Sequence, residues 1–187
     1  MKLQYTIPLL VLALLSPSIA RSADKVVVIP MHSKSSRTQG TQLLSVPAAA
    51  FHAFKNSIQY TNDGKEIYCT GGTECSFLTP VYLPDGAMIS ELTVFYEDCH
   101  DDNALVSLQR ITQDGVEASI IGLYTYGGAN GTGGGTCVKG SETKDTLYIN
   151  EPIDNSTYSY YIWLNLPYTS DTARVTIYSV QLKYEAQ

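Results

Sequence analysis

"SFLTPVYLPDGAMISELTVFYED" (residues 76–98) decides the fold class of this chain. It contains two runs rich in Val, Ile, Leu, Thr and Tyr, separated by Pro-Asp-Gly. β-branched and aromatic residues favour strands, whereas Pro-Asp-Gly is typical of a tight turn. The stretch therefore predicts two successive strands joined by a turn.

The same pattern continues through the rest of the chain. Between Asn-Asp-Gly, Gln-Asp-Gly and the Gly-rich run "GGANGTGGG", short apolar stretches recur at residues 60–69, 103–115, 116–126, 145–153, 156–167 and 173–185. No stretch keeps a 3.6-residue apolar period, and only "VPAAAFHAF" (46–54) predicts a brief helix. About eight short strands without helices between them predict an all-β, antiparallel two-sheet sandwich that is jelly-roll-like.

The last strand has an irregular apolar pattern. Val175 and Ile177 have one parity, while Tyr178, Val180, Leu182 and Tyr184 have the other. A β-bulge near Ile177 would place both groups on the same face of the sheet. The alternative is a strand that is buried on both faces. Either arrangement makes the C-terminal strand part of the core.

The first twenty residues have the pattern of an export signal. Lys2 is followed by an apolar run (7–15), and Ser18 and Ala20 form a small-x-small cleavage pattern. This run is too short to span about 30 Å of hydrocarbon, and no later stretch is apolar enough to do so. We therefore expect a signal peptide (1–20), an N-terminal strand and flexible linker (21–45), and a sandwich domain (46–187). The mature protein is expected to be soluble and secreted, in the periplasm or outside the cell.

Export also determines the expected state of the four cysteines. An even number of cysteines in an oxidising compartment favours two disulfides, and four cysteines allow three connectivities. We favour Cys69–Cys75, which closes a short loop, and Cys99–Cys137, which joins two distant turns. No C-x-x-C spacing supports a zinc site.

Charge is distributed unevenly along the chain. Residues 21–55 contain five basic residues and one acid, whereas residues 56–187 contain six basic residues and seventeen acids. An acidic domain lacks the clustered Lys and Arg that phosphate contacts need, so nucleic-acid binding is not expected. The acids suit divalent cations or neutral ligands, or they serve only to keep the domain soluble.

The connection "DCHDDN" (98–103) is the most polar loop of the chain. Asp98, Asp101, Asp102 and Asn103 offer hard oxygen ligands that suit structural calcium, although the EF-hand spacing is absent. The alternative is an ordinary solvated turn between two strands. No cofactor other than structural calcium is expected.

Other chemistry has less support in the sequence. A glycosidase needs two opposed carboxylates in a cleft, and no second acid matches this loop. The mature chain has only three histidines, His32, His52 and His100, too few and too scattered for a transition-metal site. The chain also lacks a G-x-S-x-G elbow and a P-loop.

Aromatic residues give the clearer functional indication. In "STYSYYIWLNLP" (156–167), Tyr158, Tyr160, Ile162, Leu164 and Leu166 form one face, which we expect in the core. Tyr161 and Trp163 lie on the other face. If that face is exposed, they form a platform on which a sugar ring can stack; if it is covered, they belong to the core.

The N-terminal run Val26, Val27, Val28 and Ile29 suggests a different role. A β-branched segment on a linker can add to the open edge of a neighbouring copy, and head-to-tail repetition of that contact would build a fibre. The alternatives are pairing within its own domain and disorder.

The quoted motifs resemble a group of uncharacterised exported bacterial proteins. These share a Val-Pro-Ala-Ala-Ala-Phe start (46–51), a Leu-Pro-Asp-Gly-Ala centre (83–87) and Tyr-rich C-terminal strands. The leader "DKVVVIP" is similar to exported proteins of sulfate- and metal-reducing bacteria. The resemblance implies a secreted β-sandwich and brings no activity or site residues.

The sequence therefore favours a non-enzymatic module that binds carbohydrate or another cell-surface component through Tyr161 and Trp163. The second hypothesis is a self-assembling fibre or matrix subunit that exchanges residues 26–29 between copies. A glycoside hydrolase-like enzyme built on the acidic loop is the third.

Overall fold

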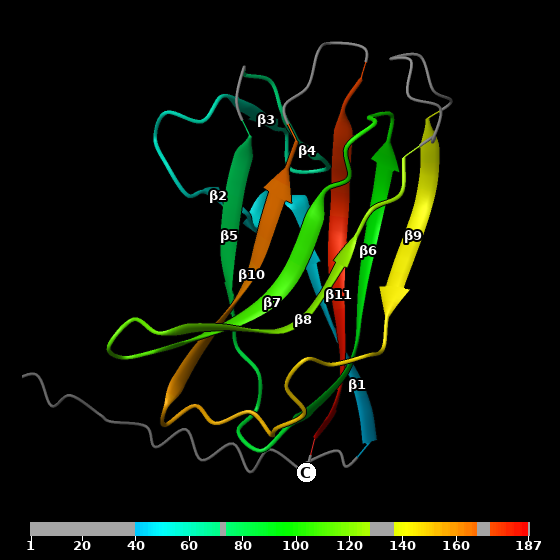
Figure 1. The fold of residues 1–187 in the computed structure, drawn as a ribbon. Helices are drawn as coiled ribbons and strands as arrows, with labels where there is room; N and C mark the ends of the chain where they lie inside the picture. Colours follow the sequence, from blue (N-terminus) through cyan, green and yellow to red (C-terminus); the bar gives the residue numbers. More distant parts are fainter. Residues whose placement is uncertain (1–39, 72–73, 128–136, 168–172, 187) are drawn as a thin grey trace, which may run out of the picture. The chain divides into compact units, whose positions relative to one another are not determined.

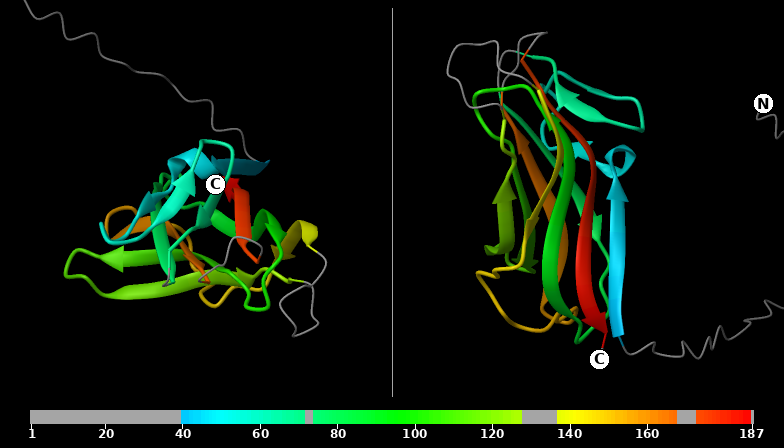
Figure 2. Two further views of the ribbon diagram at one scale, coloured as in Figure 1. Left: turned by 90° about the horizontal axis from the view of Figure 1, so that it is seen from above. Right: turned by 90° about the vertical axis from the view of Figure 1, so that its right-hand side faces the viewer.

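The computed structural model describes residues 40–71, 74–127, 137–167 and 173–186. In these ranges the chain forms eleven strands and one short 3-10 helix, η1 (Ala48–Ala50). The strands lie in two antiparallel sheets stacked face to face (Figures 1 and 2). The predicted all-β, two-sheet, disulfide-bonded sandwich is therefore confirmed.

The two sheets have six and five strands. Sheet A has the order β3 (Tyr60–Asn62), β4 (Ile67–Cys69), β11 (Val175–Ala186), β6 (Met88–Asp98), β9 (Val138–Lys144), and β1 (Gly40–Pro47) also pairs with β11. Sheet B has the order β2 (His52–Ala53), β5 (Cys75–Val81), β10 (Tyr158–Leu166), β7 (Leu105–Thr112), β8 (Glu117–Tyr124).

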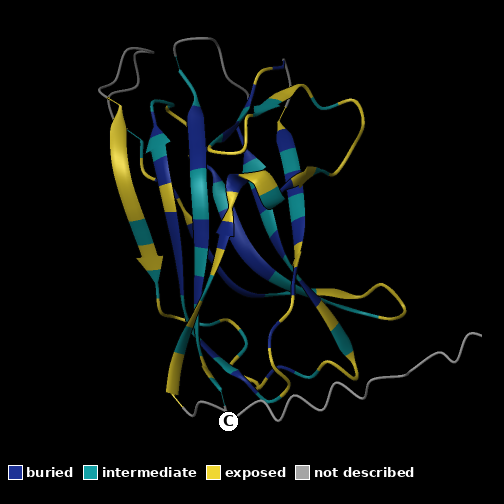
Figure 3. Ribbon diagram, turned by 180° about the vertical axis from the view of Figure 1, so that it is seen from behind, coloured by how far each residue is buried: buried dark blue, intermediate teal, exposed yellow. Residues whose placement is uncertain are grey.

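The strands beyond the expected eight are short or polar. Residues 60–69 form a two-strand hairpin, because Asn62-Asp63-Gly64 turns the chain in the middle of that stretch. Strand β9 is almost entirely exposed at the edge of sheet A, so it has no apolar alternation to detect (Figure 3). Residues 40–45, expected in the linker, belong to β1, where Leu44 packs against the core and Val46 is buried.

The core lies between the sheets and confirms the predicted bulge. Ile177 pairs with Tyr96 and Ser179 pairs with Phe95, so Tyr178 is the extra residue on β11. Val175, Ile177, Val180 and Leu182 are consequently all buried, whereas Tyr178 and Tyr184, grouped with Val180 by parity, are half-buried. The predicted core face of β10 is also buried from Tyr160 to Leu166, while Tyr158 is half-buried.

Two disulfides join the strands in the predicted pairing. Cys69–Cys75 connects β4 of sheet A to β5 of sheet B, and Cys99–Cys137 connects the end of β6 to the start of β9. The bridges suit an oxidising compartment. Among the described residues, no helix has the length and hydrophobicity needed to cross a membrane.

Candidate functional site

Asp98 has a structural role at the end of β6. Its side chain is fully buried. Its Oδ1 accepts a hydrogen bond from the His100 N–H at 2.9 Å, and its Oδ2 accepts one from the Thr125 hydroxyl at 2.5 Å. Burial raises the pKa of Asp98, and these two hydrogen bonds oppose that change. Asp98 thus ties the acidic loop to the segment that follows β8.

The other three residues predicted to bind calcium differ from Asp98 in burial. Asp101, Asp102 and Asn103 are exposed. The Asp102 N–H donates to His100 Nδ1 at 2.8 Å, and Asn103 Oδ1 accepts from the Gly127 N–H at 3.4 Å. The loop is thus held by its own hydrogen bonds. Structural calcium here remains a prediction.

No set of acidic side chains in the described ranges converges as an ion site would require. The only group there with three potential ligand atoms close together is Glu97, Cys99 and Cys137, and both cysteines are used in a disulfide. A cation would therefore have to be bound mainly by backbone carbonyls and water.

The outer face of sheet B presents the aromatic residues that the sequence singled out. Tyr161 and Trp163 are both half-buried on β10, with their ring centroids 6.5 Å apart. No strand of the described chain lies over them, so they are surface residues of the sandwich and not part of its core. Burial and the neighbouring carboxylate of Glu117, which accepts a hydrogen bond from the phenol, raise the pKa of Tyr161 to about 12.

Phe54 completes this aromatic group, and sequence reasoning missed it. It follows β2, whose His52 and Ala53 pair with Leu78 and Phe77 of β5. The Phe54 N–H then donates to the Ser76 carbonyl at 2.9 Å, which fixes the backbone. The Phe54 ring is 51% exposed and meets the Trp163 indole edge-on, with centroids 4.9 Å apart.

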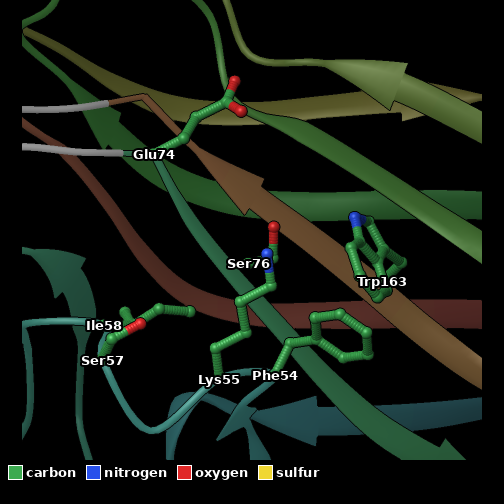
Figure 4. Close-up of a pocket in the computed structure, with 7 residues that line it drawn as sticks. All are labelled: Phe54, Lys55, Ser57, Ile58, Glu74, Ser76 and Trp163. Atoms are coloured by element: carbon green, nitrogen blue, oxygen red, sulfur yellow. The ribbon is translucent and has the colours of Figure 1, made fainter.

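The Phe54–Trp163 pair forms one wall of a pocket of about 430 Å³, here called the Trp163 pocket. Figure 4 shows the two rings side by side, with Ser57 and Ile58 across from them and Glu74 above. Its lining consists of Phe54, Lys55, Ser57, Ile58, Glu74, Ser76 and Trp163. Aromatic rings and a few polar groups around a concave space are the usual make-up of a ligand site.

Polar side chains flank the rings on the neighbouring strands. The Ser76 hydroxyl donates to Asn165 Oδ1 at 3.2 Å, and Gln109 Nε2 donates to the Ser107 hydroxyl at 2.7 Å. Ser107 lies directly opposite Trp163 on β7. The half-buried side chains of Ser76, Gln109 and Asn165 have further lone pairs and protons with which to bind a polar ligand, whereas Ser107 is buried.

Two other predictions concern different parts of the chain. The predicted assembly strand, Val26, Val27, Val28 and Ile29, lies outside the described residues, as does the predicted signal peptide. For the enzyme hypothesis, the carboxyl group with a raised pKa among the described residues is Asp98, and it is not one of the residues that line the Trp163 pocket.

Comparison with known proteins gives distant structural matches. No family model and no curated protein matches the chain. One similar structure is the CBM36-1 domain of a multidomain xylanase from the hindgut metagenome of Trinervitermes trinervoides (12% identity, 75% of this chain, 96% of that chain, TM-score 0.44). A second is the C-terminal CBM6 of a laminarinase from Zobellia galactanivorans (13% identity, 75% and 98%, TM-score 0.40).

A third match is a cleaved adhesin domain of Lys-gingipain from Porphyromonas gingivalis (14% identity, 78% of this chain, 99% of that chain, TM-score 0.41). Identities and TM-scores are low throughout. The residues of the site itself therefore have to support any functional assignment.

Proposed function

We propose that the chain is an exported, non-catalytic module that binds carbohydrate on the outer face of sheet B. The observation that supports this most directly is the edge-on contact between the partly exposed rings of Phe54 and Trp163 beside a pocket with polar walls. Large aromatic side chains that stay at the surface next to a concave space are typical of binding sites.

The chemistry of the pocket suits a sugar ring. A pyranose has an apolar face of C–H groups and a rim of hydroxyls. Trp163 offers a flat apolar surface for the first, while Ser76 and Glu74 offer hydrogen-bonding atoms for the second. Ser57 and Lys55 add further polar groups to the lining of the pocket. The pocket thus combines a stacking surface with orienting polar groups.

One further observation favours binding without catalysis, and a second favours a location outside the cytoplasm. Asp98 hydrogen-bonds within the protein, so the carboxyl group with a raised pKa is engaged in holding a loop. The two disulfides suit an oxidising compartment. A secreted module that attaches to glycans fits both features.

A binding screen on the mature protein tests the proposal. Wild type and Trp163→Ala would be run in affinity electrophoresis against soluble β-glucan, xylan and galactan. We expect wild type to be retarded by at least one of them. Loss of the indole should weaken that binding by about tenfold or more, as for a buried aromatic anchor.

Phe95→Ala is the matched control. Phe95 is also a partly exposed aromatic residue within a strand, but it lies between the inward-facing Val94 and Tyr96 and thus on the outer face of the opposite sheet. The Phe95→Ala variant should bind glycans as tightly as wild type. Equal binding by wild type and Trp163→Ala, or no binding by wild type to any glycan, would refute the proposal.

A further inference from the structure

Three hollows on the surface of the sandwich share lining residues. The first is the Trp163 pocket. The second, here called the central hollow, has about 490 Å³ and is lined by Glu74, Asp102, Asn103, Tyr124 and Pro167. The third, the tyrosine pocket, has about 300 Å³ and is lined by Gly122, Leu123, Tyr124, Tyr126, Glu142, Thr143, Lys144 and Tyr148. Glu74 lines the first two and Tyr124 lines the last two, so the hollows adjoin one another.

The residues of the central hollow lie at one end of sheet B, on four neighbouring strands. Glu74 precedes β5, Pro167 follows β10, Asn103 precedes β7 and Tyr124 ends β8. These four strands are consecutive in the sheet. The span from β5 to β8 is three strand spacings of about 4.8 Å each, or about 14 Å in all. This span is longer than one sugar ring.

Two small, buried residues of β7 and β8 lie between Trp163 and the tyrosine pocket in the sheet. Ser107 of β7 lies opposite Trp163 on one side and Gly122 of β8 on the other. A Cβ on Gly122 would lie 3.2 Å from the Ser107 Cβ and 3.7 Å from Tyr148 Cε2. A Cβ at position 122 would therefore press on Ser107, whereas its distance from the Tyr148 ring is that of ordinary van der Waals contact.

Tyr148 is held in this place by two hydrogen bonds. Its N–H donates to the Ile120 carbonyl at 2.7 Å, and its hydroxyl donates to the Gly122 carbonyl at 3.4 Å. The side chain nevertheless remains 64% exposed, and those of Tyr124 and Tyr126 are 54% and 60% exposed. Three exposed aromatic side chains around one pocket, on an ordered backbone, have the make-up of a second stacking site.

The charged residues of the central hollow, Glu74 and Asp102, are both acidic. Glu142 and Lys144 both line the tyrosine pocket. Lys55 is the single basic residue of the Trp163 pocket. Carboxylates repel an anionic chain and accept hydrogen bonds from the hydroxyls of a neutral one.

We infer that the three hollows form one continuous track that binds an extended, uncharged polysaccharide chain across the strands of sheet B. Trp163 stacks one sugar at one end of the track, and Tyr124 with Tyr148 stacks another at the far end. The inference rests on the proposed carbohydrate-binding function and adds the length and the charge of the ligand. A single terminal sugar would use only one of the two ends.

Calorimetry with a length series tests the track. The probes are the di-, tetra- and hexasaccharides of whichever of the three neutral polysaccharides binds wild type, with polygalacturonate as the anionic probe. The variants are Trp163→Ala, Tyr124→Ala, the double variant Tyr124→Ala/Tyr148→Ala and the Phe95→Ala control. Thermal unfolding of each variant, followed by circular dichroism, establishes that it is folded.

We expect wild type to bind the hexasaccharide more tightly than the disaccharide. The double tyrosine variant should lose about tenfold in affinity for the hexasaccharide while binding the disaccharide like wild type. Tyr124→Ala alone, whose side chain makes no hydrogen bond found in the described residues, should show part of the same loss. Polygalacturonate should bind more weakly than the neutral chain.

The outcomes separate this inference from the proposed function. If Trp163→Ala loses binding but both tyrosine variants bind the hexasaccharide like wild type, the track is refuted and the Trp163 pocket stands. If Trp163→Ala binds every length like wild type, the proposed function fails as well. If polygalacturonate binds as tightly as the neutral hexasaccharide, the inference that the ligand is uncharged is refuted.

Discussion

Phe54 meets Trp163 edge-on, with ring centroids 4.9 Å apart and ring planes at 64°. The two rings come from β10 and from the residue after β2, the two neighbours of β5 in sheet B. Phe54 therefore limits how the indole can tilt. A rigid indole loses less conformational entropy when a ligand stacks on it, so Phe54 should contribute to binding through Trp163.

A double-mutant cycle measures that contribution. Phe54→Ala alone should weaken glycan binding by less than Trp163→Ala, and Trp163→Phe should fall between Trp163→Ala and wild type. The double variant Phe54→Ala/Trp163→Ala should bind glycan about as weakly as Trp163→Ala alone, because the effect of Phe54 depends on the indole. We expect a coupling free energy of about 1 kcal/mol from calorimetry. Strictly additive losses would mean that Phe54 contacts the ligand by itself.

The sequence predicted the features that depend on neighbours along the chain. Asn-Asp-Gly, Pro-Asp-Gly and Gln-Asp-Gly turns end in Gly64, Gly86 and Gly115, each with a positive φ as such turns require. The bulge at Tyr178 followed from a change of apolar parity within one strand. Both signals are local, so no knowledge of distant partners was needed.

Features that depend on distant partners could not be predicted in the same way. Strand β2 has only two residues, too few to show an alternation, so nothing in the sequence placed Phe54 beside Trp163. Tyr148 likewise reaches Gly122 through a loop without periodicity. Asp98 was grouped with the exposed acids of its loop, because only the partner Thr125 reveals its burial.

Asp98 should make the stability of the protein depend on pH in an unusual direction. Burial raises the pKa of its carboxyl above the ordinary value of 3.8. The folded state then keeps this proton at pH values where the unfolded chain has lost it. The contribution of Asp98 to the free energy of unfolding is therefore largest below pH values near 3.8, the ordinary pKa. It falls as the pH rises through the folded-state pKa.

Urea unfolding of wild type and Asp98→Asn from about pH 2 to pH 7 measures this effect. The unfolding free energy of Asp98→Asn minus that of wild type should increase as the pH rises. Asp63→Asn is the control with the opposite sign, because N–H groups of Lys65 and Glu66 lower the pKa of Asp63. A constant difference for Asp98→Asn would contradict the prediction.

The two disulfides should differ in their contribution to stability. Cys99–Cys137 closes a loop with a sequence separation of 38 and Cys69–Cys75 one of 6. In the chain-entropy model these loops correspond to about 4 and about 2 kcal/mol. Replacing each pair by alanine and measuring urea unfolding should give the larger loss for Cys99/Cys137. The reverse order would indicate that the buried packing of Cys69 and Cys75, which join the two sheets, outweighs loop entropy.

Deletion of Tyr178 should leave the fold intact even though it shortens a central strand. Tyr178 is the extra residue of the bulge, and without it Ile177 and Val180 keep the same inward parity in a regular strand. The cost should be about 1–2 kcal/mol, from loss of the 2.7 Å hydrogen bond to Glu97 and of the Lys139 ammonium over the ring.

Deletion of Gln181 is the matched control for the bulge. If β11 then becomes regular, Val180 turns outward and Ser179 turns into the core. That change buries a hydroxyl and exposes an apolar side chain, so it should cost about 2–4 kcal/mol, more than deletion of Tyr178. Circular dichroism and urea unfolding compare the two deletions. Equal losses would mean that the bulge is needed for the register of β11 with β6, and that its removal strains the sheet.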